Sequence, residues 1–217
     1  MEIKIWSNHQ ESVPTIYIHS FVGNGEDVWN ACQAMGCPPF NLVSIHKGNF
    51  DDELSPWPAE GVWKGQAPFG GKAEEHLKEV IDEVLPKVES ELPAPSRYVA
   101  MVGYSLAGLF TLWSTYHTDR FKRIGCVSSS FWYPSFIPFI KKNQMKRQPD
   151  CIYFSLGDKE SKSKHPLMKQ VNERTQEVVN WIRETGIPTV FEMNPGNHFT
   201  EPEVRTAKAI KWLLEQE

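Results

Sequence analysis

The chain has 217 residues, of which 40% are hydrophobic and 12% aromatic, enough for a domain with a sizeable core. A formal net charge of −4 at pH 7 removes the electrostatic case for nucleic-acid binding. No run approaches 18 consecutive apolar residues, and the N-terminus lacks a basic segment leading into an apolar one, so we expect neither a membrane span nor a signal peptide.

Short apolar, β-branched runs alternate along the chain with segments of helical period. Several of the runs are apolar on both faces, which is typical of parallel strands covered on both sides. The alternation predicts a single α/β domain over residues 1–217, with helices on both faces of a parallel sheet. The predicted strands are 3–6, 15–19, 42–46, 98–102, 124–127, 152–156 and 189–193, and the predicted helices are 73–92, 106–115, 167–182 and 204–214.

Two further features of the sequence are an irregular segment, 50–71, and the four cysteines. The Pro- and Trp-rich segment 50–71 follows neither period, which predicts a long functional loop or a surface cover. The four cysteines lack metal-ligand spacing, and two of them sit in apolar strand-like runs, so we expect reduced thiols in a cytoplasmic protein. The cysteines are Cys32, Cys37, Cys126 and Cys151.

The most informative segment surrounds Ser105, which stands between Gly103 and Ala107 where a predicted strand gives way to a predicted helix. Such a tight turn holds the serine Oγ clear of the backbone, at a helix N-terminus that favours developing negative charge. The pattern departs from G-x-S-x-G because Ala107 occupies its last place and Gly108 comes one residue later. An ordinary Gly-Ser turn that closes a β-α unit is the alternative interpretation.

Polar side chains follow three predicted strands at the point where each strand ends. Ser105 follows the strand 98–102, Asp158 and Glu160 follow 152–156, and His198 follows 189–193. Ligands gather at the carboxyl ends of parallel strands, so these residues are expected at one edge of the sheet. The chain order of serine, acid and histidine is the order found in α/β-hydrolases.

The chemistry explains why these residue types belong together. A serine hydroxyl attacks poorly unless a base removes its proton, and imidazole can do this near neutral pH and then protonate the leaving group. A carboxylate behind the imidazole fixes its tautomer. We prefer Glu160 over Asp158 for that role, and we expect Glu160→Gln to lower activity with stability nearly unchanged and Asp158→Asn mainly to lower stability. A loop histidine that caps the following helix is the alternative for His198.

The oxyanion of an ester-hydrolysis intermediate needs two backbone N–H donors. The residue after the serine, Leu106, supplies one in this type of turn. The segment 19–25 is similar to the His-Gly-x loop of α/β-hydrolases with Ser20 in place of glycine, and this resemblance assigns the second donor to Phe21. An ordinary Gly-rich turn is the alternative for this loop.

Four segments together resemble the putative-esterase branch of the α/β-hydrolases, which includes enterochelin-type siderophore esterases, feruloyl esterases and S-formylglutathione hydrolase. The resemblance implies an α/β-hydrolase fold, a three-layer sandwich with a mostly parallel central sheet, and a serine hydrolase without a defined substrate. The segments are Gly-Tyr-Ser-Leu-Ala-Gly-Leu-Phe (103–110), Val-Ser-Ser-Ser-Phe-Trp-Tyr-Pro (127–134), Tyr-Phe-Ser-Leu-Gly-Asp-Lys-Glu (153–160) and Asn-Pro-Gly-Asn-His-Phe (194–199).

We therefore predict a serine esterase that acts on a small-molecule ester and needs no metal or organic cofactor. A thioesterase or acyltransferase with the same acyl-enzyme is the alternative within enzymes, and a non-catalytic binding protein is the alternative of another class. Trp132 follows the strand 124–127, and Trp57 and Trp63 lie in the segment 50–71. These three tryptophans are candidates to line the substrate pocket, with core packing as the alternative for each.

Overall fold

The central feature of the computed structural model, which describes residues 1–7, 11–21, 25–46, 48–62 and 64–216, is a seven-stranded sheet. Its strand order is β1-β3-β2-β6-β7-β8-β9. β1 pairs antiparallel with β3, and each of the other neighbouring pairs is parallel. The strands are β1 (Glu2–Trp6), β2 (Thr15–His19), β3 (Asn41–His46), β6 (Val99–Tyr104), β7 (Arg123–Val127), β8 (Cys151–Gly157) and β9 (Thr189–Asn194).

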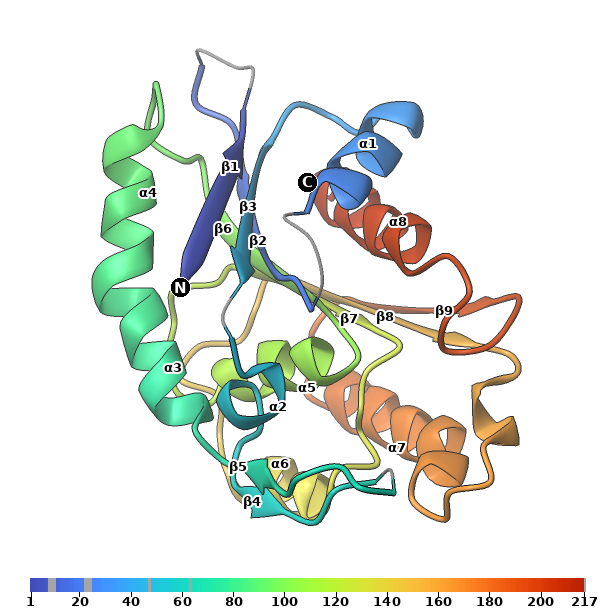
Figure 1. Cartoon of the computed structure of the whole chain (residues 1–217). Helices are drawn as coiled ribbons and strands as arrows, with labels where there is room; N and C mark the ends of the chain where they lie inside the picture. The colour runs from blue at the N-terminus through green and yellow to red at the C-terminus, as the bar shows by residue number, and fades with distance from the viewer. Residues whose placement is uncertain (8–10, 22–24, 47, 63, 217) are drawn as a thin grey trace.

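Helices cover both faces of this sheet (Figure 1). On one face α1 (Glu26–Ala34) packs beside α8 (Pro202–Leu214), which lies against β6, β7 and β8. On the other face α5 (Leu106–Ser114) packs on β6 and β7, and α7 (Val171–Glu184) packs on β8 and β9. The buried apolar side chains form two clusters, one under each helical layer, because strands such as β2 and β7 are buried along their whole length. The predicted mostly parallel sheet with helices on both faces is confirmed.

The predicted helix over residues 73–92 is present, with a widened turn in its middle. It consists of α3 (Ala73–Glu79), a π-helical turn (Val80–Val84) and α4 (Leu85–Glu91). Pro86 stands at the start of α4 and has no backbone N–H, so the regular hydrogen bond to the residue four earlier cannot form. The π-helical turn accommodates this break while the helix keeps its direction.

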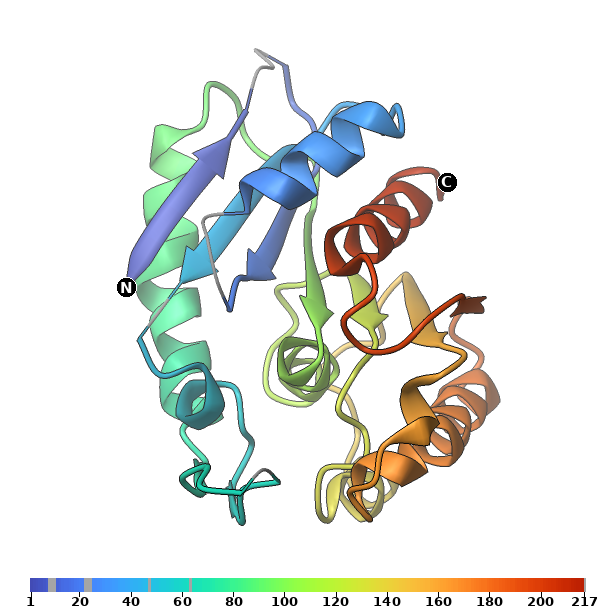
Figure 2. The same cartoon turned by 45° about the vertical axis from the view of Figure 1, so that its right-hand side comes forward.

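Between β3 and α3, the described residues 48–62 and 64–72 lie beyond the carboxyl ends of the parallel strands (Figure 2). It contains α2 (Phe50–Glu53) and a short antiparallel pair, β4 (Pro58–Ala59) with β5 (Phe69–Gly70). Within the part of the chain that the structure describes, no helix has the length and apolar character needed to cross a membrane.

Candidate active site

Ser105 occupies a strained backbone turn between β6 and α5. Its φ of 60° and ψ of −122° lie in a region that non-glycine residues rarely adopt, and this strain is stored at the turn. Gly103 permits the turn, because a Cβ at this position would come within 2.1 Å of the carbonyl oxygen of Ala107. Gly108 is needed one residue after the usual motif position, because a Cβ there would lie 2.0 Å from Ser129 Oγ.

The structure brings Ser105, His198 and Glu160 into one hydrogen-bonded chain. His198 Nε2 lies 3.0 Å from Ser105 Oγ, and His198 Nδ1 lies 2.9 Å from Glu160 Oε2. A carboxylate can only accept, so Nδ1 carries the proton and donates it to Glu160. In a neutral imidazole Nε2 is then an acceptor, and the Ser105 hydroxyl donates to it. The histidine is therefore oriented to remove the serine proton.

Glu160 is buried and its two oxygens have separate partners. Oε2 accepts from His198, while Oε1 accepts from Ser128 Oγ at 2.8 Å and from the Gly157 N–H at 2.7 Å. Burial by itself would raise the pKa of Glu160, but the hydrogen bond and charge of His198, with the Ser128 and Gly157 hydrogen bonds, lower it from its ordinary value. Glu160 is consequently held as a carboxylate at neutral pH.

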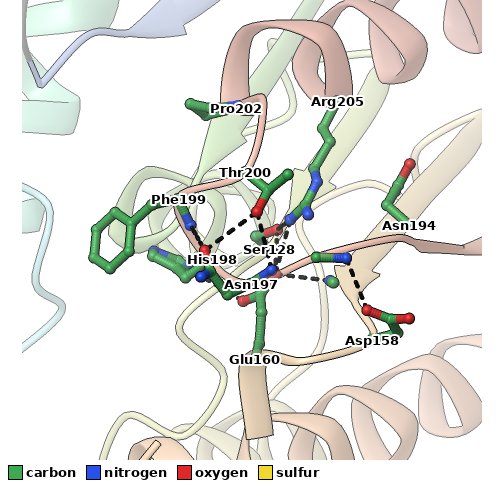
Figure 3. A network of polar contacts seen from close by, with 12 residues as sticks. Ser128, Asp158, Glu160, Asn194, Asn197, His198, Phe199, Thr200, Pro202 and Arg205 are labelled. Atoms are coloured by element: carbon green, nitrogen blue, oxygen red, sulfur yellow. Dashed lines mark hydrogen bonds and ion pairs between the residues drawn. The ribbon is translucent and has the colours of Figure 1, made fainter. Parts of the chain in front are cut away.

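Asp158 has a different position from Glu160 although only two residues separate them. Its Oδ1 accepts a hydrogen bond from the Gly196 N–H at 2.7 Å, and its own N–H donates to Asn194 O at 2.8 Å. Figure 3 shows Asp158 beside the loop after β9 and away from the imidazole of His198. Asp158 thus connects the loop after β8 to the loop that carries His198.

Sequence reasoning assigned no role to three residues that hold this network, although it placed the segment 128–134, which begins with one of them, at the site. Arg205, on the first turns of α8, is buried and its Nη1 donates to Glu160 Oε1 at 3.1 Å (Figure 3). Ser128 has a φ of 46° and directs its hydroxyl to the same oxygen. The Tyr104 hydroxyl donates to the carbonyl of His198 at 2.6 Å. Ser128 and Tyr104 carry the signal used for the other site residues, since each is a polar residue at the end of a strand.

Leu106 and Phe21, whose N–H groups are expected from sequence to bind the oxyanion, both line a cavity of about 1110 Å³ that Ser105 and His198 also line. Within the described ranges of the chain, neither backbone N–H donates a hydrogen bond to another backbone group. The Phe21 side chain is 67% exposed and its ring packs edge-on against that of Phe50 at 5.2 Å. Residues 22–24 of the same loop lie outside the described residues.

The three candidate tryptophans differ in position. Trp132 lines the cavity. Trp57 does not, which corrects the expectation for this residue: its Nε1–H donates to Pro134 O at 2.9 Å, and its ring packs against Tyr133 and Phe139. Through this hydrogen bond and these ring contacts, Trp57 attaches the segment 50–71 to the loop before Phe136 and does not line the cavity. Trp63 lies outside the described residues.

A second histidine, His19, also lines the cavity but faces another partner. Its Nε2 lies 3.0 Å from His76 Nε2, and the rings of both histidines pack against Phe110 of α5. Burial, together with the neighbouring His76, places the pKa of His19 well below its ordinary value, so the ring stays neutral. His19 therefore does not titrate in the range where an ordinary histidine does. Among the described residues, no group of three His, Cys, Asp or Glu side chains is arranged to hold a metal ion.

Comparison with known proteins adds a family and a fold. The family model described as "Putative esterase" matches residues 6–199. The uncharacterized protein YbbA from Bacillus subtilis (strain 168) is 24% identical over 188 residues, which is 83% of this chain and 75% of that protein. An IroE-like serine hydrolase from Shewanella oneidensis aligns with a TM-score of 0.79 at 17% identity, covering 98% of this chain and 75% of its own. Siderophore hydrolase EstA from Aspergillus nidulans aligns with a TM-score of 0.73 at 15% identity, covering 98% and 89%. The fold that these structures share is that of an α/β-hydrolase.

Proposed function

Because the chain belongs to this esterase family and is a carboxylic ester hydrolase by that membership, we propose that it cleaves its substrate through an acyl-enzyme on Ser105. The observation that carries the proposal is the chain of hydrogen bonds from Ser105 Oγ through His198 to Glu160, with distances of 3.0 and 2.9 Å, on the wall of a cavity. This is the geometry that nucleophilic catalysis by serine requires. Ser105, His198 and Glu160 would act as a catalytic triad, with Ser105 on a nucleophile elbow.

In the proposed first step, Ser105 Oγ attacks the ester carbonyl carbon as His198 Nε2 takes the hydroxyl proton. The carbonyl oxygen becomes an oxyanion, which would accept hydrogen bonds from the N–H groups of Leu106 and Phe21. Collapse of the intermediate breaks the ester bond, and His198 returns its proton to the departing alcohol. A water molecule, deprotonated by His198, then attacks the acyl carbon. The bond to Ser105 Oγ breaks as His198 returns this proton to Oγ, which releases the carboxylic acid and restores the serine hydroxyl.

A panel of esters tests the proposed activity. We expect the purified protein to hydrolyse p-nitrophenyl esters, since p-nitrophenolate is a good leaving group. The dependence of the rate on acyl chain length will show how long an acyl chain the cavity accommodates. Feruloyl, siderophore-lactone and acetyl-sugar esters belong in the same panel, because relatives with this fold include siderophore hydrolases. Release of p-nitrophenol at the buffer rate by folded protein would contradict the proposal.

The pH dependence of the reaction should show a single protonation on its acid side. His198 must be neutral to accept the serine proton, so the rate falls as the imidazole gains a proton at lower pH. The lowered pKa of Glu160 keeps that carboxylate ionised below the pH at which an ordinary glutamate protonates, so it adds no second proton. We expect log(kcat/KM) against pH to have a slope of about one on the acid limb. A slope of two would contradict the assignment of the ionised acid to Glu160.

We also infer that the protein works in a reducing compartment, namely the cytoplasm. All four cysteines are free thiols, and three of them are buried. Thiols persist in this state where glutathione and thioredoxin keep them reduced.

A further inference from the structure

Arg205 is a buried cation placed directly behind the proposed acid. Its side chain is 3% exposed, and the Nη1 group lies 3.1 Å from Glu160 Oε1 and 3.3 Å from Ser128 Oγ. The Nη2 group donates to Pro195 O at 2.8 Å, in the loop that leads to His198. Figure 3 shows the guanidinium between Ser128 and the loop after β9. One side chain thus connects α8, the acid and the loop of the base.

The local backbone is built to admit this contact. A Cβ at Gly157 would come within 2.9 Å of both Arg205 Nη1 and Glu160 Oε1, and within 2.5 Å of Gly196 O. Only glycine leaves room for the guanidinium and the carboxylate to meet at this point. The contact between Arg205 and Glu160 therefore depends on the glycine at the end of β8.

Other ionisable groups among the described residues lie on the elements around the Glu160–His198 pair. β6 contributes Tyr104, whose pKa is raised by burial, so its phenol stays neutral. The loop after β8 contributes Asp158, which is engaged with the Gly196 N–H, and α8 contributes Glu203 on the cavity wall. Arg205 is the cation in direct contact with Glu160 among the described residues.

We propose that Arg205 is a positioning residue that sets the ionisation of the Glu160–His198 pair and fixes the direction of the Glu160 carboxylate. The proposal rests on the proposed function in that it assigns Glu160 and His198 to catalysis. The guanidinium has two separable effects. Its positive charge offsets the negative charge of the Glu160 carboxylate. The carboxylate therefore stabilises the imidazolium of His198 less than an unpaired carboxylate would. Its planar fork holds Oε1, which leaves Oε2 aimed at His198.

The two effects predict different behaviour for two substitutions. Arg205→Gln keeps hydrogen-bond donors but removes the charge, so Glu160 stabilises the imidazolium more strongly. The pH midpoint of the acid limb, the acid-side fall in kcat/KM, reports the protonation of the coupled Glu160–His198 pair. This midpoint should then rise by about one pH unit. Arg205→Lys keeps the charge but loses the fork, so the limb should stay in place while kcat falls about tenfold at constant KM.

Lys208 offers a matched control for charge. It lies one turn further along α8, and its Nζ donates to Glu192 and Asn194 at 2.7 Å without contacting Glu160. Lys208→Gln removes one positive charge from the same helix by the same type of substitution. We expect this variant to keep both the position of the acid limb and the value of kcat.

The experiment is a pH titration of wild type and the three variants, followed by ester hydrolysis and by NMR of protein labelled with ¹⁵N-histidine. His198 is assigned from the signal lost in His198→Gln. An upward shift in Arg205→Gln alone, in both measurements, supports the proposal. A midpoint in Arg205→Gln equal to that of wild type would overturn it, and so would an equal shift in Arg205→Lys. If Arg205→Gln does not fold, Arg205→Lys decides: an unmoved limb with lower kcat supports the proposal, and a raised limb contradicts it.

The NMR titration reads the imidazole without a substrate. A wild-type protein that hydrolyses no ester would defeat the proposed function, yet the effect of Arg205 on His198 would still be measured. The two failures are therefore distinguishable.

Discussion

Ser105→Ala is expected to reduce ester turnover by about four orders of magnitude or more, because it removes the atom that would form the acyl-enzyme. The N–H groups of Leu106 and Phe21 and the cavity remain, so a small rate above the uncatalysed reaction should survive. The substitution deletes one hydroxyl from a turn whose strain comes from its backbone, and the fold should be kept. The measurement is kcat/KM on an activated ester, beside a circular dichroism spectrum and a melting curve.

Ser114→Ala provides the control for deletion of a serine hydroxyl, in the helix that Ser105 precedes. Ser114 is buried near the end of α5, and its hydroxyl donates to Thr111 O at 2.8 Å, far along the helix from the cavity. This variant should keep most of the wild-type kcat/KM. If Ser105→Ala retained more than about a tenth of the activity in folded form, the assignment of the nucleophile would be wrong.

Glu160→Gln is expected to lower kcat by about two to four orders of magnitude, because an amide cannot stabilise the imidazolium that forms on His198. Asp158→Asn should stay within about threefold of wild type, since Asp158 contacts the Gly196 N–H and not the imidazole. It should lower the free energy of unfolding by about 1 kcal/mol, through a weaker hydrogen bond to Gly196. Steady-state kinetics and denaturant melts of both variants separate the two acids.

The structure changes one part of the expectation from sequence. Glu160→Gln was expected to leave stability nearly unchanged, but Glu160 is the buried partner of Arg205. Removing one member of a buried ion pair leaves the other charge uncompensated, which lowers the free energy of unfolding by about 3–5 kcal/mol. The amide oxygen of the glutamine can still accept hydrogen bonds, which reduces this loss. Kinetics of this variant must therefore be measured where the melting curve shows it folded. Activity that is lost from Asp158→Asn and retained in Glu160→Gln would transfer the role to Asp158.

The fold and the edge of the sheet that carries the site follow from local sequence. Apolar runs located the strands to within one or two residues, and the polar residue after each strand marked the site, because the strands are parallel and end at one edge. The helices α1 and α6 (Phe136–Lys142) were not predicted. Each is short, and α1 begins after a glycine in the left-handed conformation, a start that the sequence pattern does not distinguish from a turn.

The site's supporting contacts depend on three-dimensional packing. Asp158 and Glu160 are two residues apart, and only the turn after β8 decides which one reaches the imidazole. Arg205 joins Glu160 across 45 residues of sequence, from a helix whose stripe of apolar residues gives no sign of a buried cation. The position of Trp57 could not be predicted from local sequence either, because its N–H donates to the carbonyl of Pro134, in the loop before α6.

The central claim is that Ser105 is the nucleophile of a serine esterase, and covalent labelling with a fluorophosphonate tests it most directly. The reagent transfers its phosphonyl group to an activated serine Oγ with loss of fluoride, and peptide mass spectrometry locates the adduct. We predict one adduct on Ser105 in the wild-type protein, none at that position in Ser105→Ala, and slow formation in His198→Gln. An unlabelled Ser105 in folded wild-type protein, or an adduct on another residue, would contradict the account.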